Sequence, residues 1–196
     1  KEIGYVIYTF VEYGTKELKS HKKILIKDAK LWTMEGDEVI EKGDVLIDNG
    51  KIIQMGTISV NEDNIKVIDG SGMHLTPGII DEHSHIALTG VNEGSQSVTS
   101  EVRMKDVVNS EDINIYRQLA GGVTTAQLLH GSANPVGGQS AIIKFRWGSS
   151  PENMLIDGAD EYIKFALGEN VKRSRAPSSS RFPDTRMGVE LSLIHI

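Results

Sequence analysis

Two histidines, His83 and His85, stand one residue apart at the end of a short apolar run, residues 78–80. Side chains alternate between the two faces of a strand, so both imidazoles share one face and can offer two nitrogen ligands to one cation. An ordinary pair of surface histidines is the alternative. The context carries more weight than the spacing, because a Pro-Gly pair precedes the strand and Asp81 lies within it. We therefore favour a metal site.

The sequence contains no cysteine. Disulfides, thiolate zinc sites and cysteine nucleophiles are therefore excluded, and a metal has to be held by histidine, carboxylate or a modified side chain. Neutral imidazole is the form that binds metal, so protonation of His83 and His85 is expected to release it. We expect metal content, and any activity that depends on it, to fall together below about pH 6.

A third histidine, His130, ends the next predicted strand, residues 123–130, just before a glycine-rich loop. From that position its side chain can contact substrate, and a buried structural histidine is the alternative. Gly137 and Gly138 can supply backbone donors for a carboxylate or phosphate group. The signal for a phosphate loop is weak, since no Gly-Lys-Ser/Thr sequence follows.

A long polar connection, residues 92–103, follows the strand that carries the histidine pair. Connections in this place often form substrate loops or lids. Glu93 and Arg103 are candidates for substrate contacts there, with solvated surface charges as the alternative. Asp81 is expected to orient the site.

Strands and helices alternate after Pro77, which predicts a parallel sheet covered by helices. Ser110 is a candidate N-cap for a helix over residues 111–120, and Gly121-Gly122 ends it. The predicted strands number about half of an eight-stranded barrel. They cover residues 78–85, 123–130, 140–147 and 161–167. A further helix is expected to open near residue 185.

Residues 23–76 have a different pattern, with short β-rich runs separated by close turn signals. Asn49-Gly50 between two apolar runs is a strong signal for a two-residue hairpin. This part of the sequence predicts a small β domain. Residues 3–13, rich in β-branched and aromatic types, also read as a strand.

The chain has 196 residues, of which 39% are hydrophobic and 24% charged, with a formal net charge of −6. This is the composition of a globular protein. No Lys/Arg-rich block indicates nucleic-acid binding, and no run approaches the roughly 20 apolar residues of a membrane-spanning helix. The expected partner is a small-molecule substrate, and a homo-oligomer stays open. The sequence starts at Lys1, so a cytoplasmic and a periplasmic location both stay open.

The run LTPGIIDEHSH, residues 75–85, resembles the Pro-Gly-x-Ile-Asp-x-His-x-His signature of the metal-dependent amidohydrolase superfamily. The segments IDGSGMHLTPG and GGVTTAQ are similar to that superfamily as well, and the resemblance covers roughly residues 24–190. It is strongest to the imidazolonepropionase and prolidase branch.

This resemblance implies a (β/α)8 TIM barrel preceded by a small β-sandwich, with one or two divalent metals such as Zn2+. His83 and His85 are the implied ligands of the first metal. The implied reaction is hydrolysis of an amide or cyclic amide carbon–nitrogen bond by a metal-activated hydroxide. A non-catalytic scaffold or binding protein on the same fold is the alternative.

Lys164 is the third candidate metal ligand, because bimetallic members of the family place a carboxylated lysine that bridges two metals near the end of the fourth strand. A carbamate is an anionic oxygen ligand, whereas a free ammonium would be repelled by two dications. Alternatively, Lys164 caps a carbonyl or pairs with Glu161. Lys144 is a rival for the same role.

We expect four segments, and we interpret the chain as an N-terminal portion that is inactive alone. Later metal ligands and the general base are expected beyond residue 196, so no catalytic residue is assigned. The final LSLIHI is an apolar break that we interpret as a non-native tail, and His195 is given no role. The segments are an extension at 1–22, a β-sandwich at 23–76, half a barrel at 77–190 and the tail at 191–196.

Overall fold

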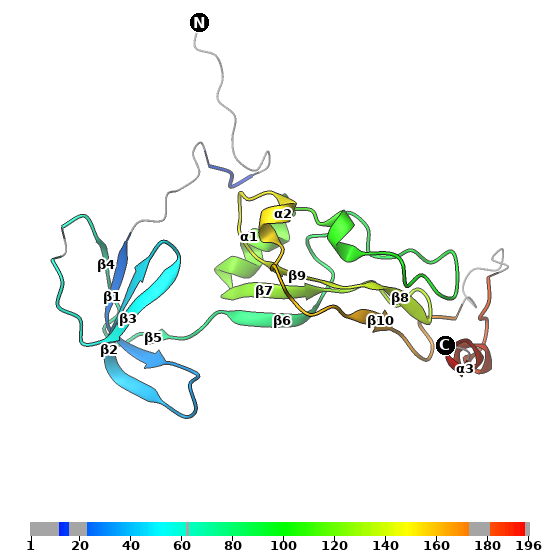
Figure 1. The fold of residues 1–196 in the computed structure, drawn as a ribbon, viewed down its shortest axis with the longest axis horizontal. Helices are drawn as coiled ribbons and strands as arrows, with labels where there is room; N and C mark the ends of the chain where they lie inside the picture. Colours follow the sequence, from blue (N-terminus) through cyan, green and yellow to red (C-terminus); the bar gives the residue numbers. More distant parts are fainter. Residues whose placement is uncertain (1–11, 16–22, 62, 173–180, 195–196) are drawn as a thin grey trace, which may run out of the picture. The chain divides into compact units, whose positions relative to one another are not determined.

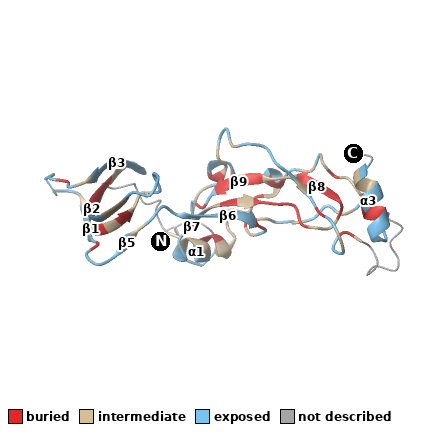
Figure 2. Ribbon diagram, turned by 90° about the horizontal axis from the view of Figure 1, so that it is seen from below, coloured by how far each residue is buried: buried red, intermediate tan, exposed pale blue. Residues whose placement is uncertain are grey.

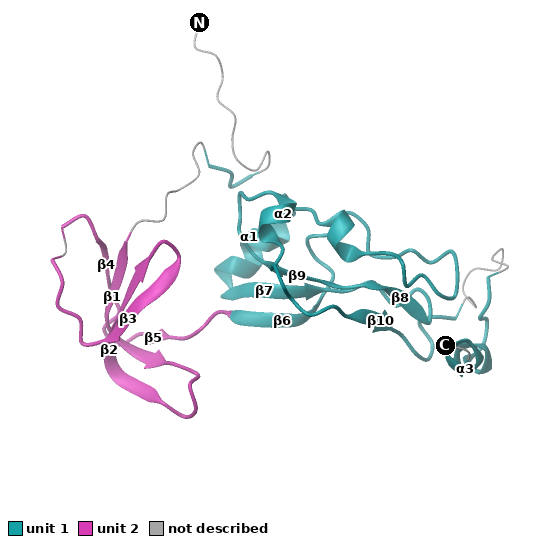
Figure 3. Cartoon of the chain, viewed as in Figure 1, with its two compact units in different colours: residues 1–17, 79–196 teal, residues 18–78 magenta. Residues whose placement is uncertain are grey.

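The computed structural model describes residues 12–15, 23–61, 63–172 and 181–194. The chain divides into two compact units (Figure 1, Figure 3). The smaller is residues 18–78, and the larger is residues 79–196 together with 1–17. The division after Gly78 falls where the sequence changes from β-rich runs to alternating strands and helices. Most of the strand predicted over residues 3–13 lies outside the described residues.

The smaller unit is a five-stranded sheet in the order β3-β2-β1-β4, with β5 also beside β1. Strand β1 runs antiparallel to β2 and parallel to β4 and β5. The predicted hairpin is confirmed: Asn49 and Gly50 join β2 to β3 with φ angles of 48° and 73°, the left-handed pair that a type I′ turn requires. The strands are β1 Ile24–Trp32, β2 Val39–Asp48, β3 Lys51–Gly56, β4 Lys66–Asp69 and β5 His74–Leu75.

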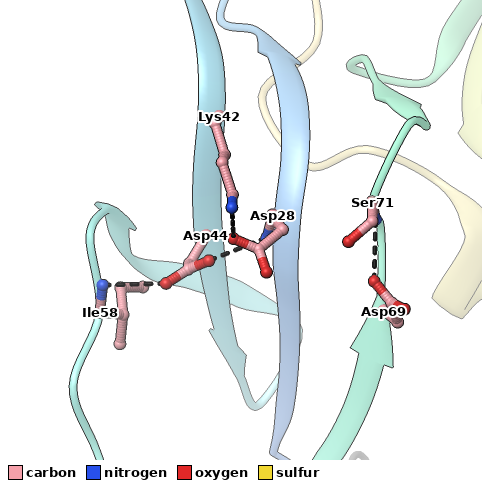
Figure 4. Close-up of polar contacts among 6 residues, drawn as sticks. All are labelled: Asp28, Lys42, Asp44, Ile58, Asp69 and Ser71. Atoms are coloured by element: carbon pink, nitrogen blue, oxygen red, sulfur yellow. Dashed lines mark hydrogen bonds and ion pairs between the residues drawn. The ribbon is translucent and has the colours of Figure 1, made fainter.

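A buried carboxylate, Asp44, holds an irregular point of this sheet together (Figure 4). The register of β1 shifts near Asp28, whose φ is 60°. Asp44 Oδ1 accepts the backbone N–H of Asp28 at 3.0 Å, and Oδ2 accepts that of Ile58 at 3.0 Å. The hydrogen bond from the Asp28 backbone is the main cause that lowers the pKa of Asp44. Figure 4 also shows Asp69 capping the turn at Ser71.

Replacing Asp44 with asparagine is expected to lower the free energy of unfolding of the smaller unit by about 1–3 kcal/mol at pH 7, because an amide offers one acceptor oxygen where the carboxylate offers two. The folded-state pKa is depressed, so this stabilisation is present above the unfolded pKa of about 3.9 and is lost as pH falls through the folded pKa. Urea unfolding followed through Trp32 in a Trp147→Phe background measures it.

The matched control for this change is Asp48→Asn, which removes only a partly exposed ion pair with Lys23 and should change stability by less than about 1 kcal/mol. The difference between wild type and the Asp44 variant should shrink below about pH 4. A difference that stays constant with pH would contradict the assigned role of the ionised carboxylate.

The described residues of the larger unit form two small sheets, one with the order β6-β7-β9 and one pairing β10 with β8 (Figure 1). Strands β6 and β7 are parallel and are connected through α1, as predicted. The elements are β6 Ile79–Ser84, a 3-10 turn Met104–Val107, α1 Ile113–Ala120, β7 Val123–Leu128, β8 Val136–Gln139, β9 Ala141–Lys144, α2 Pro151–Met154, β10 Ile163–Phe165 and α3 Arg186–Ile194.

The parallel orientation predicted for the third and fourth strands is wrong. Strand β9 runs antiparallel to β7, and β10 runs antiparallel to β8. A parallel partner needs a crossover, usually helical. Residues 129–140 between β7 and β9 contain no helix, because Pro135 and two successive glycines oppose one. The chain therefore turns back on itself as a long hairpin.

Helix α1 begins two residues later than predicted, with Asp112 rather than Ser110 as its N-cap. Asp112 Oδ1 accepts the N–H of Asn114 at 2.9 Å, while Oδ2 accepts the N–H of Ala87 at 2.7 Å. The two carboxylate oxygens of Asp112 accept from the helix and from the chain after β6, whereas a serine hydroxyl has a single oxygen. The predicted C-terminal helix is confirmed as α3, which includes residues 191–194 of the suspected tail.

The main core of the larger unit lies between its three-stranded sheet and the helices (Figure 2). Ile115, Leu128, Ile143 and Met154 are fully buried there. The first two residues of β6 contrast with them, since Ile79 and Ile80 are 57% and 69% exposed. Residues 12–15 belong to this unit, where the Tyr13 ring stacks on Tyr116. None of the described helices is long and apolar enough to cross a membrane.

Candidate metal centre

The histidine pair sits at the carboxyl end of β6, with the two ring centroids 5.2 Å apart and the planes nearly perpendicular at 83°. Both side chains are exposed. His85 Nδ1 lies 2.9 Å from the carbonyl oxygen of Leu129. A carbonyl only accepts hydrogen bonds, so Nδ1 carries a proton, and in the neutral ring Nε2 of His85 is the nitrogen with the lone pair. That is the tautomer in which a histidine binds metal through Nε2.

Lys164 reaches the same place from β10, although it lies 81 positions further along the chain. Its Nζ is 3.4 Å from His83 Nε2. The structure brings Lys164 to the histidine pair. Within the described part of the chain, it does not show such a contact for the rival Lys144 on β9. The three candidate ligands that the sequence named therefore gather in one cluster.

The surroundings of His83 favour the neutral form of its ring. Desolvation lowers its pKa first, the positive charge of Lys164 lowers it further, and His85 does so when its own ring is protonated. A lowered pKa extends the neutral, metal-binding form of the ring below the usual range of histidine. Asp81 accepts the backbone N–H of His83 at 3.1 Å, a local contact within β6 where the pairing with β7 shifts register.

This cluster fits a metal in part. In the described ranges of the chain, no three histidine, aspartate or glutamate side chains gather closely enough to hold an ion. Two imidazoles with an available lone pair supply two of the three protein ligands that catalytic zinc sites use. The amine of Lys164 becomes a ligand only after it loses its proton or is carboxylated. The chemistry of the donor set is thus compatible with a divalent metal.

His130 is placed differently from the other candidates. It is 0% exposed, its Nε2 accepts the backbone N–H of Glu93 at 2.7 Å, and its Nδ1 lies 2.8 Å from the carbonyl of Gly131. Both ring nitrogens are engaged with the backbone. This arrangement favours the structural interpretation of His130 over the substrate-binding one that the sequence also allowed.

The glycine pair after His130 is required by close packing. A Cβ at Gly137 would lie 2.6 Å from His130 Nδ1, and one at Gly138 would lie 2.6 Å from the carbonyl oxygen of Val102. Both glycines are buried in β8. They allow β8 to lie against the histidine and the connection after β6, and this role carries no anion-binding requirement.

Gly138→Ala is expected to lower the free energy of unfolding of the larger unit by about 1–3 kcal/mol, because the Val102 backbone has to move to admit the methyl group. Urea unfolding followed through Trp147 in a Trp32→Phe background measures the change. Gly90→Ala is the matched control, since a Cβ there meets nothing within 4 Å. Equal stability of the two variants would contradict the packing role.

The polar connection after β6 is packed along part of its length. Val98 bridges Val136 of β8, and Arg103 bridges Gln139. The Arg103 side chain pairs with Asp106 at 2.8 Å, whereas the Glu93 carboxylate accepts the N–H of Ser95 at 3.0 Å. Each of these two charged groups thus has a partner close by in the sequence. We name residues 91–99 the rim segment.

The chain is similar to known proteins over most of its length. No protein-family model matches the chain. The chain is 35% identical over 202 residues to the amidohydrolase tasK of Hapsidospora irregularis, covering 85% of this chain and 20% of that protein. A solved amidohydrolase from Thermotoga maritima MSB8 is 38% identical and superposes with a TM-score of 0.72 over 87% of this chain. The chain belongs to the amidohydrolase superfamily. The family predicted from residues 75–85 is thereby confirmed.

A shorter similarity links this amidohydrolase chain to imidazolonepropionase of Staphylococcus aureus (strain Newman), at 36% identity over 73 residues. The chain spans 18% of that enzyme, 20% of tasK and 45% of the solved Thermotoga chain. It therefore covers less than half the length of each of these relatives.

Proposed function

We propose that the protein carrying this chain is a metal-dependent hydrolase of amide or cyclic amide carbon–nitrogen bonds, and that His83 and His85 hold its first metal. One observation carries the proposal: Lys164 Nζ lies 3.4 Å from His83 Nε2 across 81 positions of sequence. Membership of the amidohydrolase superfamily supports the hydrolytic reaction.

We further propose that the larger unit is the first part of a (β/α)8 barrel and that residues 23–76 form a β-sandwich domain. The parallel pair β6 and β7 joined through α1 supports the first part. The exposed Ile79 and Ile80 support it too, since barrel strands are buried on both faces. The superposition on 45% of the Thermotoga amidohydrolase agrees with a partial fold.

A bound divalent metal supplies two effects at such a site, lowering the pKa of water to about 7 and polarising a carbonyl. The chain's own residues prepare the place. The lowered pKa of His83 favours its neutral, metal-binding form, and the Leu129 carbonyl orients the His85 ring with Nε2 turned away from that contact. Lys164, carboxylated by carbon dioxide, would replace a repelling cation with an anionic oxygen ligand. None of the described residues is assigned as the general base.

Metal analysis of the complete protein tests the proposal. We expect at least one divalent metal ion, such as Zn2+, per chain and hydrolysis of a member of a panel of dipeptides, N-acyl amino acids, cyclic amides and imidazolones. A chelator should abolish this hydrolysis, and added Zn2+ should restore it. If metal-free protein hydrolyses a substrate and added Zn2+ does not change the rate, the metal-dependent assignment is overturned. If the protein hydrolyses nothing with or without Zn2+, the non-catalytic scaffold is favoured.

A further inference from the structure

One arginine, Arg181, gathers main-chain carbonyls from segments far apart in the sequence. One terminal nitrogen, Nη1, donates to the carbonyls of Gly94 at 2.9 Å and Gln96 at 3.3 Å. The other, Nη2, donates to those of Ala133 at 2.8 Å and Val171 at 2.9 Å. The side chain therefore contacts three different connections of the larger unit at once.

Each of these connections leaves a strand that leads to the candidate metal centre. Gly94 and Gln96 belong to the rim segment, which follows β6 and the histidine pair. Ala133 follows β7, and Val171 follows β10 and Lys164. The guanidinium thus joins the stretches that follow both strands with candidate ligands.

The connection after β7 links Arg181 to the orientation of His85. Leu129 donates its N–H to Ser84 at 3.0 Å, and its carbonyl accepts from the His85 ring. Two residues later, Gly131 donates its N–H to Val91 of the rim segment at 2.8 Å. Residues 129–133 are therefore held between β6, the rim segment and Arg181, and the Leu129 carbonyl that orients His85 belongs to this same stretch.

Only arginine has the geometry for this arrangement. The guanidinium is a planar fork whose two terminal nitrogens can each serve two carbonyls, while a lysine ammonium presents its donors from a single point. A charged donor also makes the stronger kind of hydrogen bond to a carbonyl. Lysine at this position would keep the charge and lose the bridging of three segments.

We infer that Arg181 is a positioning residue, which holds the rim segment and the connections after β7 and β10 in the one arrangement that orients the metal centre. The part of this inference that concerns the metal rests on the proposed function. The part that concerns the rim stands on the hydrogen bonds alone.

Hydrogen exchange and zinc titration of Arg181→Ala and Arg181→Lys test the inference. We expect exchange to rise at least about tenfold in peptides covering residues 91–99 and 129–136, with no change in β1 and β2 of the smaller unit. We expect zinc affinity to weaken about tenfold in both variants, the size of effect that support groups around metal ligands have. Guanidinium ion, below denaturing concentrations, should partly reverse both effects in Arg181→Ala, and sodium chloride should not.

Arg186→Ala is the matched control, because Arg186 lies nearby in the chain, is exposed and pairs with the Glu169 side chain. It should leave rim exchange and zinc affinity unchanged. Unchanged exchange in both Arg181 variants, or a uniform rise through the larger unit, overturns the inference. Raised rim exchange with unaltered zinc affinity overturns the link to His85. If the wild-type protein binds no zinc, the proposed function is overturned instead. The exchange result then tests only whether Arg181 holds the rim segment.

Discussion

Replacing both His83 and His85 with alanine is expected to weaken Zn2+ binding at least about 100-fold, more than the 10- to 100-fold that loss of a supporting group around a metal site produces. The structure leaves the site with the Lys164 amine after both rings are removed. A protonated amine repels a dication, so little affinity should remain. Calorimetric titration with zinc chloride measures the loss, and hydrolysis by the complete protein should disappear with it.

The two single variants sharpen this experiment, because the rings are supported differently. His85 is oriented by the Leu129 carbonyl, whereas His83 is turned toward Lys164. Each single alanine should weaken binding less than the double change. His74→Ala is the matched control, since His74 lies in the smaller unit and accepts a hydrogen bond from Trp32. A double variant with wild-type zinc affinity would show that the histidine pair does not bind the metal.

Some of this centre could be predicted because the deciding physics is local. The alternation of side chains along a strand places His83 and His85 together whatever the rest of the chain does. The Asn49-Gly50 turn is local in the same sense, since its two left-handed residues fix the hairpin register. Local patterns of this kind identified the family and the histidine pair.

Other features depend on contacts that no local pattern contains. The Asp112 cap replaced Ser110 because its second oxygen meets Ala87, 25 positions away. The burial of His130 depends on Glu93 and on a glycine whose Cβ position is occupied by the ring. The orientation of β9 was predicted wrongly because the period of an apolar strand is the same in parallel and antiparallel pairs.

Arg181 gave no signal in the sequence for a related reason. Four partners of its terminal nitrogens are main-chain carbonyls, which every residue type carries, so the residue types at these positions do not point to it. It lies between a serine run, residues 178–180, and Phe182-Pro183, in a Pro/Ser-rich stretch that reads as a loop. Interactions between one side chain and distant backbone become visible only when the connections are placed in space.

Lys164→Ala is expected to lower hydrolysis by the complete protein about 100- to 1,000-fold, because a metal's stabilisation of the transition state is worth several kcal/mol. If the lysine is carboxylated and bridges two ions, the variant should bind one metal per chain in place of two. Metal content by elemental analysis and rates on the same substrate measure both effects.

The chemistry of the carbamate supplies the decisive controls for Lys164. Arginine cannot be carboxylated and stays cationic beside His83, so Lys164→Arg should be as impaired as the alanine variant. A small carboxylate such as acetate or propionate can occupy the space left in Lys164→Ala and offer the missing oxygen ligands, which should restore part of the rate and the second metal. Lys144→Ala keeps the cluster at His83 intact and should behave like wild type. A fully active Lys164→Arg variant would show that the side chain acts as a cation, and the bridging role would then be abandoned.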